Sequence, residues 1–309
     1  MKGEILVTGG AGFIGSNLVE NLVKEGHEVT VLDNLHTGSV DNLKGVEENV
    51  DFYEGPVADI FSLECDPGKI FHFGIPSSSP MYKEDHILVG QAINDFIRVL
   101  DFAKKNDSDL VFASTSSMYG PKEPPHRENM EFEPFDYYTE ARLEMERLAE
   151  MYNSLYGVNS VGMRFFSVYG PKEKAKENYA NVISQFCWSM LQDERPVIYG
   201  DGSQTRDFVY VEDVVEAVLR AARRAESIGY EAVNVGRGVE TSFNEVVEML
   251  NSTLGKNIDP KHIENPIDNY VERTKADTSK AEELLDFEHK VPVEEGINKT
   301  AEHYQKVMD

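Results

Sequence analysis

A glycine-rich loop close to the N-terminus constrains this chain more than any other feature of its sequence. Residues 5–16 read Ile-Leu-Val-Thr-Gly-Gly-Ala-Gly-Phe-Ile-Gly-Ser. Gly10, Gly12 and Gly15 satisfy the spacing G-x-G-x-x-G, and Gly9, Gly12 and Gly15 satisfy G-x-x-G-x-x-G in the same loop. Glycine permits the sharp turn out of a strand and lets the backbone approach a pyrophosphate at the N-terminus of the next helix. The pattern therefore predicts a strand, a phosphate-binding turn and a helix.

An acidic residue at the end of the next strand-like run completes a dinucleotide-binding pattern. Asp33 lies eighteen residues after Gly15. A carboxylate at this point can accept hydrogen bonds from the hydroxyls of an adenosine ribose, and it would repel a 2′-phosphate. Because no arginine follows Asp33 directly, we expect the cofactor to be NAD rather than NADP.

Short β-branched runs alternate with helical patterns through the first half of the chain. This alternation predicts an α/β fold with a doubly wound parallel sheet, a Rossmann domain, over residues 1–166. After about residue 167 the loops lengthen and the strands shorten. We therefore expect a smaller mixed α/β substrate domain over residues 167–309, with residues 210–238 rejoining the first domain.

The individual elements follow from the period of the apolar residues, which is 2 in strands and 3.6 in helices. A loop is expected over Asn257–Lys275. The expected strands are Glu4–Thr8, Glu28–Leu32, Asp51–Tyr53, Lys69–Phe73, Leu110–Ala113, Ser160–Met163, Val197–Tyr199, Phe208–Val211 and Ala232–Val235, and the expected helices are Gly12–Glu25, Tyr82–Lys105, Asp136–Tyr156, Asn181–Leu191, Val214–Arg224, Asn244–Leu254 and Glu294–Val307.

The charge and the cysteine content exclude several classes of protein. Thirty Lys+Arg against 55 Asp+Glu leave a net charge of −25, so nucleic acids and anionic membranes are not expected as partners. The two cysteines, Cys65 and Cys187, are far apart and cannot build a disulfide framework or a metal site. No apolar stretch approaches the ~18 residues of a membrane span, and the chain enters a strand-like run without a signal-peptide pattern. We expect a cytoplasmic protein without a metal.

Hydroxyl-bearing residues and a cation follow in an order that suggests catalysis. Residues 110–120 read Leu-Val-Phe-Ala-Ser-Thr-Ser-Ser-Met-Tyr-Gly, a strand that delivers Thr115 at its carboxyl end. Tyr138 and Arg142 are four residues apart at the start of an expected helix and share one face of it. A nearby positive charge favours the phenolate form of a tyrosine, which could then accept a proton while hydride passes to a nicotinamide.

With these motifs in place, the chain resembles the extended short-chain dehydrogenase/reductases of the NAD-dependent epimerase/dehydratase family. The resemblance rests on Thr8–Ser16, Asp33-Asn34-Leu35, Thr115–Gly120, Arg164–Pro171 and the run from Tyr199 to Asp213. It implies that Tyr138 is the acid/base, that Thr115 binds the sugar oxygen, and that Arg142 stands where the family has a lysine. The implied NAD contacts are Gly9, Gly10, Gly12, Phe13, Ile14, Gly15, Asp33, Asn34, Val57, Phe73, Tyr138 and Arg142.

The second half resembles a nucleotide-sugar site. Arg206 matches the arginine that clasps a diphosphate, and Tyr199 matches the position of a side chain that stacks on the base. Asn181 and Val182 match the segment that leads into the base pocket, and Ser167 replaces an asparagine. Arg273 could substitute for a second phosphate arginine, which is absent at Asn265. The family also implies a homodimer through the helices at Tyr82–Lys105 and Asp136–Tyr156.

The reaction expected from this resemblance is epimerisation at C4 of a UDP-sugar, of the UDP-glucose/UDP-galactose type, through a 4-keto intermediate. Dehydratases and decarboxylases of the family usually carry a carboxylate where this chain has Ser117 within Ser114–Gly120. Two alternatives stay open. One is a nucleotide-sugar 4-ketoreductase, and the other is an NAD-binding sensor that lost catalysis through Arg142, because arginine is not a neutral substitute for lysine.

Overall fold

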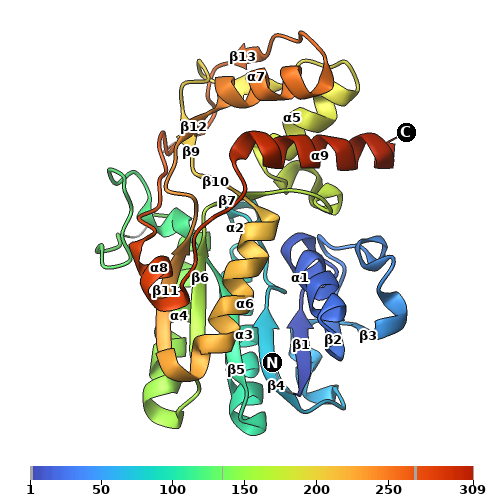
Figure 1. Cartoon of the computed structure of the whole chain (residues 1–309). Coiled ribbons are helices and arrows are strands. Elements are labelled where there is room, and N and C mark those ends of the chain that lie inside the picture. The colour runs from blue at the N-terminus through green and yellow to red at the C-terminus, as the bar shows by residue number, and fades with distance from the viewer. Residues whose placement is uncertain (1–2, 134, 268–269, 309) are drawn as a thin grey trace.

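A parallel sheet of seven strands forms the centre of the molecule (Figure 1). The computed structural model describes residues 3–133, 135–267 and 270–308. The sheet has the order β11-β6-β5-β4-β1-β2-β3, and every neighbouring pair in it is parallel. The doubly wound parallel sheet expected from the sequence is thus confirmed. Its strands are β1 (Glu4–Thr8), β2 (Val29–Asp33), β3 (Val50–Glu54), β4 (Pro67–His72), β5 (Asp109–Thr115), β6 (Ser160–Phe165) and β11 (Tyr230–Val235).

Helices cover both faces of this sheet, which is why its inner strands are apolar over most of their length. On one face α1 (Phe13–Lys24) and α6 (Val211–Ile228) pack against each other and against the sheet. On the other face α3 (Ile87–Asn106) and α4 (Tyr137–Tyr156) do the same. The two faces have separate apolar clusters, one around α1 and α6 and the other around α3 and α4. No described helix combines the length and the apolar character needed to cross a membrane.

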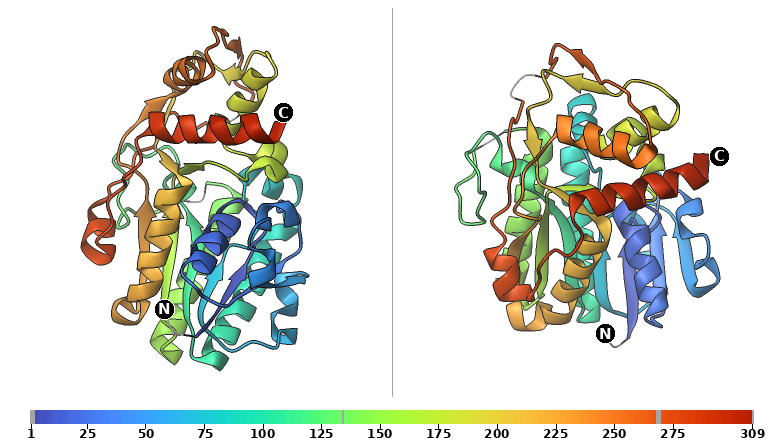
Figure 2. Two further views of the ribbon diagram at one scale, coloured as in Figure 1. Left: turned by 45° about the vertical axis from the view of Figure 1, so that its right-hand side comes forward. Right: turned by 45° about the horizontal axis from the view of Figure 1, so that its top comes forward.

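A second group of elements lies beyond the carboxyl ends of the strands (Figure 2). The chain leaves the sheet after β6 and returns to it through α6 and β11. We retain as a proposal the division into residues 1–166 and 167–309 with a return at about 210–238. The elements of this group are β7 (Ser167–Tyr169), α5 (Val182–Leu191), β8 (Val197–Tyr199), β9 (Thr205–Arg206), β10 (Phe208–Tyr210), β12 (Thr241–Ser242), α7 (Phe243–Leu254), β13 (Lys261–Ile263) and α9 (Val293–Met308), while α8 (Ser279–Leu285) packs beside α6 and β11.

Two expectations about single elements are wrong. The helix expected over Tyr82–Lys105 is two helices, α2 (Ser79–Glu84) and α3, because Asp85 adopts an extended backbone with φ −139° and ψ 101°. The Asp85 carboxylate then accepts a hydrogen bond from the Ile87 N–H at 2.9 Å, which starts the next helix. The loop expected over Asn257–Lys275 contains β13, which pairs with β8, and residues 268 and 269 of that loop lie outside the described residues.

Candidate active site

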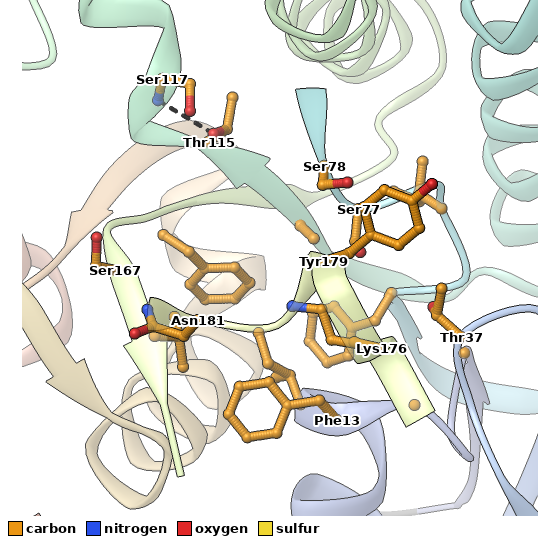
Figure 3. Close-up of a pocket in the computed structure, with 18 of the residues that line it drawn as sticks. Phe13, Thr37, Ser77, Ser78, Thr115, Ser117, Ser167, Lys176, Tyr179 and Asn181 are labelled. Atoms are coloured by element: carbon orange, nitrogen blue, oxygen red, sulfur yellow. Dashed lines mark hydrogen bonds between the residues drawn. The ribbon is translucent and has the colours of Figure 1, made fainter. Parts of the chain in front are cut away.

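A cavity of about 370 Å³ at the carboxyl edge of the sheet brings the glycine loop and the candidate catalytic residues together (Figure 3). Its walls come from the ends of β1, β4, β5 and β6, from the start of α4, and from the segment between β7 and α5. The predicted site residues among those that line it are Gly9, Gly12, Phe13, Ile14, Gly15, Phe73, Thr115, Tyr138, Arg142, Ser167 and Asn181.

The glycine loop is packed so closely that no side chain fits at Gly9 or Gly15. Gly9 has a φ of +71°, and a Cβ there would lie 2.4 Å from the backbone nitrogen of Gly74. A Cβ on Gly15 would lie 2.1 Å from the carbonyl oxygen of Gly9. The loop thus brings bare backbone to the cavity at the N-terminus of α1, which is the arrangement that binds a pyrophosphate.

Asp33 ends β2 at the mouth of a smaller neighbouring pocket. It is 6% exposed, and its two carboxylate oxygens accept hydrogen bonds from the N–H groups of Ala11 at 2.9 Å and Leu35 at 2.7 Å. Burial raises the pKa of this carboxyl, and the backbone hydrogen bonds oppose that shift. The smaller pocket adds the predicted cofactor residues Asn34 and Val57, and it shares Gly9, Gly12 and Phe73 with the first cavity.

The residues of the smaller pocket that sequence reasoning missed include Gln91 and Asp95, two polar residues of α3. Burial raises the pKa of the Asp95 carboxyl, against a hydrogen bond from the Gln91 side chain. No local motif marks these two residues, because they reach the pocket only through the packing of α3 beside β4.

Thr115 and Tyr138 converge on the cavity from different elements. Thr115 is the last residue of β5, and its hydroxyl oxygen accepts a hydrogen bond from the Ser117 N–H at 3.1 Å (Figure 3). Tyr138 lies in the first turn of α4, which Asp136 and Thr139 start through a reciprocal capping box. The Tyr138 ring is 9% exposed and packs on Tyr82 with ring centroids 5.5 Å apart. The two candidate catalytic side chains therefore line the same cavity.

Arg142 lies beside Tyr138, yet its guanidinium is held by the backbone. The side chain is 2% exposed, and its Nη2 donates a hydrogen bond to the carbonyl of Pro76 at 2.8 Å. Its Cζ lies 5.1 Å from the centroid of the Tyr138 ring. Its Nε is buried with no hydrogen-bond partner among the described residues. Arginine is longer than the lysine of the family, which explains how it reaches the loop after β4.

The remaining predicted substrate residues do not line this cavity. Val182 is the first residue of α5, and Tyr199 is exposed at the end of β8. The Arg206 guanidinium lies over the ring of Tyr270, 5.1 Å from its centroid. Arg273 forms two hydrogen bonds with the Glu240 carboxylate, at 2.9 and 2.8 Å. These four residues belong to the second group of elements and lie outside the lining of the cavity.

Two serine hydroxyls in the cavity wall also escaped sequence analysis. The Ser77 and Ser78 hydroxyls are buried and have no hydrogen-bond partner among the described residues. They follow β4, at the edge of the sheet where parallel α/β folds bind ligands, and the run Ser77-Ser-Ser79 was the available signal. With the bare glycine backbone and Asp33, these unpaired groups fit a polar dinucleotide and its co-substrate.

Behind the cavity, a buried ion pair joins α4 to the sheet. Arg164 on β6 donates to both carboxylate oxygens of Glu146 on α4, at 3.0 and 2.7 Å. The same carboxylate accepts a hydrogen bond from Ser114, the residue before Thr115. The Tyr119 hydroxyl accepts from Arg164 and donates to Asn234. This network fixes the end of β5 against the helix that carries Tyr138.

His72 at the end of β4 adds a pH dependence to the stability of the fold. It is fully buried, and its Nδ1 lies 2.7 Å from the Thr8 hydroxyl oxygen. Burial, assisted by the charge of Arg142, lowers the pKa of His72 from 6.5 to about 3. Below pH ~6.5 only the unfolded chain takes up this proton, so stability is lost as the pH falls and is retained above that value.

We predict that this histidine costs about 2 kcal/mol of stability between pH 7.5 and pH 5, at about 1.4 kcal/mol per pH unit below its unfolded pKa. Urea unfolding of the wild type and of His72→Asn at both pH values measures this contribution. The other titrating groups contribute equally to both proteins, so their effects cancel in the difference of the two unfolding free energies. If the difference in unfolding free energy between the two proteins does not change with pH, His72 takes up its proton as readily in the folded state as in the unfolded chain. That result would contradict the lowered pKa.

The comparisons with known proteins agree with this geometry. The model of the family described as "NAD dependent epimerase/dehydratase family" matches residues 5–236. The chain belongs to this family. A putative UDP-glucose 4-epimerase of Methanocaldococcus jannaschii is 35% identical over 306 residues, which are 96% of both chains. UDP-glucuronic acid decarboxylase 1 of Xenopus tropicalis is 33% identical, over 99% of this chain and 73% of its own.

A solved structure is similar as well. UDP-glucose 4-epimerase of Thermotoga maritima with UDP-glucose superimposes with a TM-score of 0.91 at 33% identity, over 99% of this chain and 100% of its own. The predictions of the family, of an enzyme and of NAD as its cofactor are confirmed. The relatives in this NAD-dependent epimerase/dehydratase family include both epimerases and decarboxylases, so family membership alone does not select the reaction.

Proposed function

We propose that this chain is a UDP-sugar C4 epimerase of the UDP-glucose/UDP-galactose type. The observation that carries the proposal is the cavity itself, which Thr115 and Tyr138 line together with the glycine loop, and where the end of β5 offers hydroxyls in place of a carboxylate. Epimerisation needs only a reversible hydride transfer and one acid/base group, whereas elimination or decarboxylation needs a further group to handle a second proton.

The carboxylates of the cavity support this choice. Among the described residues that line it, Glu173 is the one carboxylate. Glu173 is fully buried and accepts hydrogen bonds from the Asn181 N–H at 2.7 Å, the Ser184 hydroxyl at 2.7 Å and the Lys176 amino group at 3.1 Å. A carboxylate held in this way is poorly placed to remove a proton from a sugar.

In the proposed mechanism, the Tyr138 oxygen accepts the proton of the sugar 4-hydroxyl and later returns it. The Thr115 hydroxyl hydrogen-bonds the same sugar oxygen and holds it near Tyr138. The Arg142 guanidinium, whose Cζ lies 5.1 Å from the centroid of the Tyr138 ring, would hold that ring in place. The glycine loop and Asp33 would hold NAD, which would supply the reversible hydride acceptor that epimerisation at C4 requires.

We also propose roles for the other substrate residues. Ser167 and Asn181 line the cavity and would contact the sugar and the nucleotide. Tyr199, Arg206 and Arg273 lie outside its lining and would bind the base and the diphosphate, with Val182 supporting the base pocket. In this assignment Arg273 must exchange its bond to Glu240 for the ligand, because both of its hydrogen bonds are now made to that carboxylate.

The decisive experiment incubates the purified protein and NAD with UDP-galactose and follows UDP-glucose by NMR. We expect a stable mixture of both sugars with no net gain of NADH absorbance. Sustained NADH formation, with release of a 4-keto sugar, would instead indicate the 4-ketoreductase running in reverse. A parallel incubation with UDP-glucuronate tests for decarboxylation. Release of carbon dioxide there would contradict the argument from the missing carboxylate.

A second candidate, an NAD-binding sensor, is favoured by one observation, the bond from Arg142 to the carbonyl of Pro76 at 2.8 Å. A cation occupied in this way could fail to assist Tyr138. This candidate predicts that the wild type binds NAD but converts no UDP-sugar, and that Arg142→Lys creates activity. An active wild type that Arg142→Lys leaves within a few fold would reject it.

We further propose that the enzyme is a homodimer through α3 and α4. Large apolar side chains are exposed on these helices, among them Ile87, Met151 and Leu155, the last 63% exposed. Light scattering should give twice the 34.8 kDa mass of the chain, and Leu155→Arg should shift it towards the monomer, because a charge in a buried contact is costly. A wild type that is monomeric at micromolar concentration would contradict the proposal.

A further inference from the structure

A segment of the second group of elements, Pro171–Asn181, crosses above the glycine loop and is tied to the first part of the chain. The carbonyl of Pro171 accepts a hydrogen bond from the Asn17 side chain at 3.2 Å. The carbonyl of Lys172 accepts one from the Asn42 side chain, also at 3.2 Å. The Lys172 amino group forms an ion pair with Glu20 of α1 at 2.8 Å. We call this segment the strap.

The other side of the strap is anchored to α5 and α9. Glu173 makes the hydrogen bonds to Asn181 and Ser184 described above, and its own N–H donates to the Tyr304 hydroxyl at 3.0 Å. The strap is thus held from both sides, and its position relative to the glycine loop is set by side chains of four different elements. Residues that it carries towards the cavity are placed there by tertiary contacts.

One residue of the strap, Lys176, directs a cation into the cavity. Figure 3 shows its amino group inside the pocket with Phe13 below it. The nitrogen lies 5.7 Å from the centroid of the Phe13 ring, in the helix start that follows the glycine loop, and 3.1 Å from Glu173. Among the described residues that line the cavity, the cations are Lys176 and Arg142. The Arg142 guanidinium is tied to the carbonyl of Pro76, on the loop after β4, whereas Lys176 presents an ammonium group with donors left for a ligand beside the start of α1.

We propose that Lys176 binds the pyrophosphate of the dinucleotide cofactor. A protein with a net charge of −25 needs a local cation to hold a doubly negative group. The glycine loop supplies backbone N–H groups, and Lys176 supplies the charge-assisted hydrogen bond from the opposite side of the cavity. Glu173 occupies one of the three ammonium donors, which leaves two for phosphate oxygens. This inference rests on NAD as the cofactor and does not require the proposed C4 epimerisation.

The test measures binding in the full-length protein freed of nucleotide, by titration calorimetry with NAD, ADP-ribose, adenosine and UDP. We expect Lys176→Met to weaken the binding of NAD and of ADP-ribose by about tenfold, which is the effect of losing one charge-assisted hydrogen bond. Adenosine, which has no phosphate, should bind equally to both proteins, and Lys176→Arg should stay within about threefold of the wild type.

The strap itself provides the matched control. Lys174→Met removes the same charge two residues away, where the amino group lies over the Trp188 ring at 4.2 Å and does not line the cavity. The NAD affinity of Lys174→Met should equal that of the wild type.

Equal losses of affinity for adenosine and for NAD in Lys176→Met would show that Lys176 has a structural role, and would overturn the proposal. A loss confined to UDP would assign Lys176 to the diphosphate of the other substrate and overturn it too. These binding measurements do not depend on turnover. They therefore test the role of Lys176 even if the proposed epimerase activity is not found.

Discussion

Tyr138→Phe should lower turnover of UDP-galactose by about a thousandfold, while NAD remains bound. Removal of a positioned acid/base group typically costs a factor of 10²–10⁴. The phenyl ring preserves the packing on Tyr82, so the loss should fall on kcat and leave KM nearly unchanged. Steady-state kinetics, with calorimetry for NAD, separate the two effects.

The neighbouring residue offers a control for this prediction. Tyr137→Phe removes the same hydroxyl one position earlier, from a side chain that is exposed and stacks on His86. This variant should turn over within about twofold of the wild type. If Tyr138→Phe kept more than a tenth of wild-type activity, the acid/base role would have to move to another hydroxyl of the cavity. Those of Ser77 and Ser78 have no hydrogen-bond partner within the described part of the chain.

Glu146→Gln should destabilise the fold by about 3–5 kcal/mol, because it leaves Arg164 as a buried charge without its counter-charge. Both side chains are at most 5% exposed, and their closest atoms are 2.7 Å apart. Urea unfolding at neutral pH measures the free energy of unfolding directly. Because the same carboxylate holds Ser114 beside Thr115, we also expect a fall in kcat at temperatures where the variant stays folded.

Glu144→Gln provides the comparison on the same helix. Glu144 pairs with Arg147 at 3.5 Å, and both side chains are well exposed. Exposed pairs of this kind contribute ~0–1 kcal/mol, so this variant should unfold almost like the wild type. A loss below 1 kcal/mol for Glu146→Gln would mean that water or another group compensates Arg164.

Sequence patterns predicted the structure correctly wherever a feature is produced by interactions between residues close together in the chain. The glycine spacing and Asp33 predicted a turn that a Cβ at Gly9 or Gly15 would block, and the structure shows these close approaches. The apolar runs predicted the parallel sheet, because strands covered on both faces must be apolar throughout. The break between α2 and α3 was missed because the Asp85 bond to Ile87 competes with an otherwise continuous helical period.

The sequence alone determined the fold class, the NAD-binding loop and the order of Thr115, Tyr138 and Arg142 along the chain. These follow from steric and periodic rules that act over a few residues. Only the tertiary structure decided where Arg142 points, because its partner Pro76 lies 66 positions away. It also brought Lys176 above Phe13, 163 positions earlier in the chain. Such pairs form where distant segments pack together, and no local period or spacing encodes them.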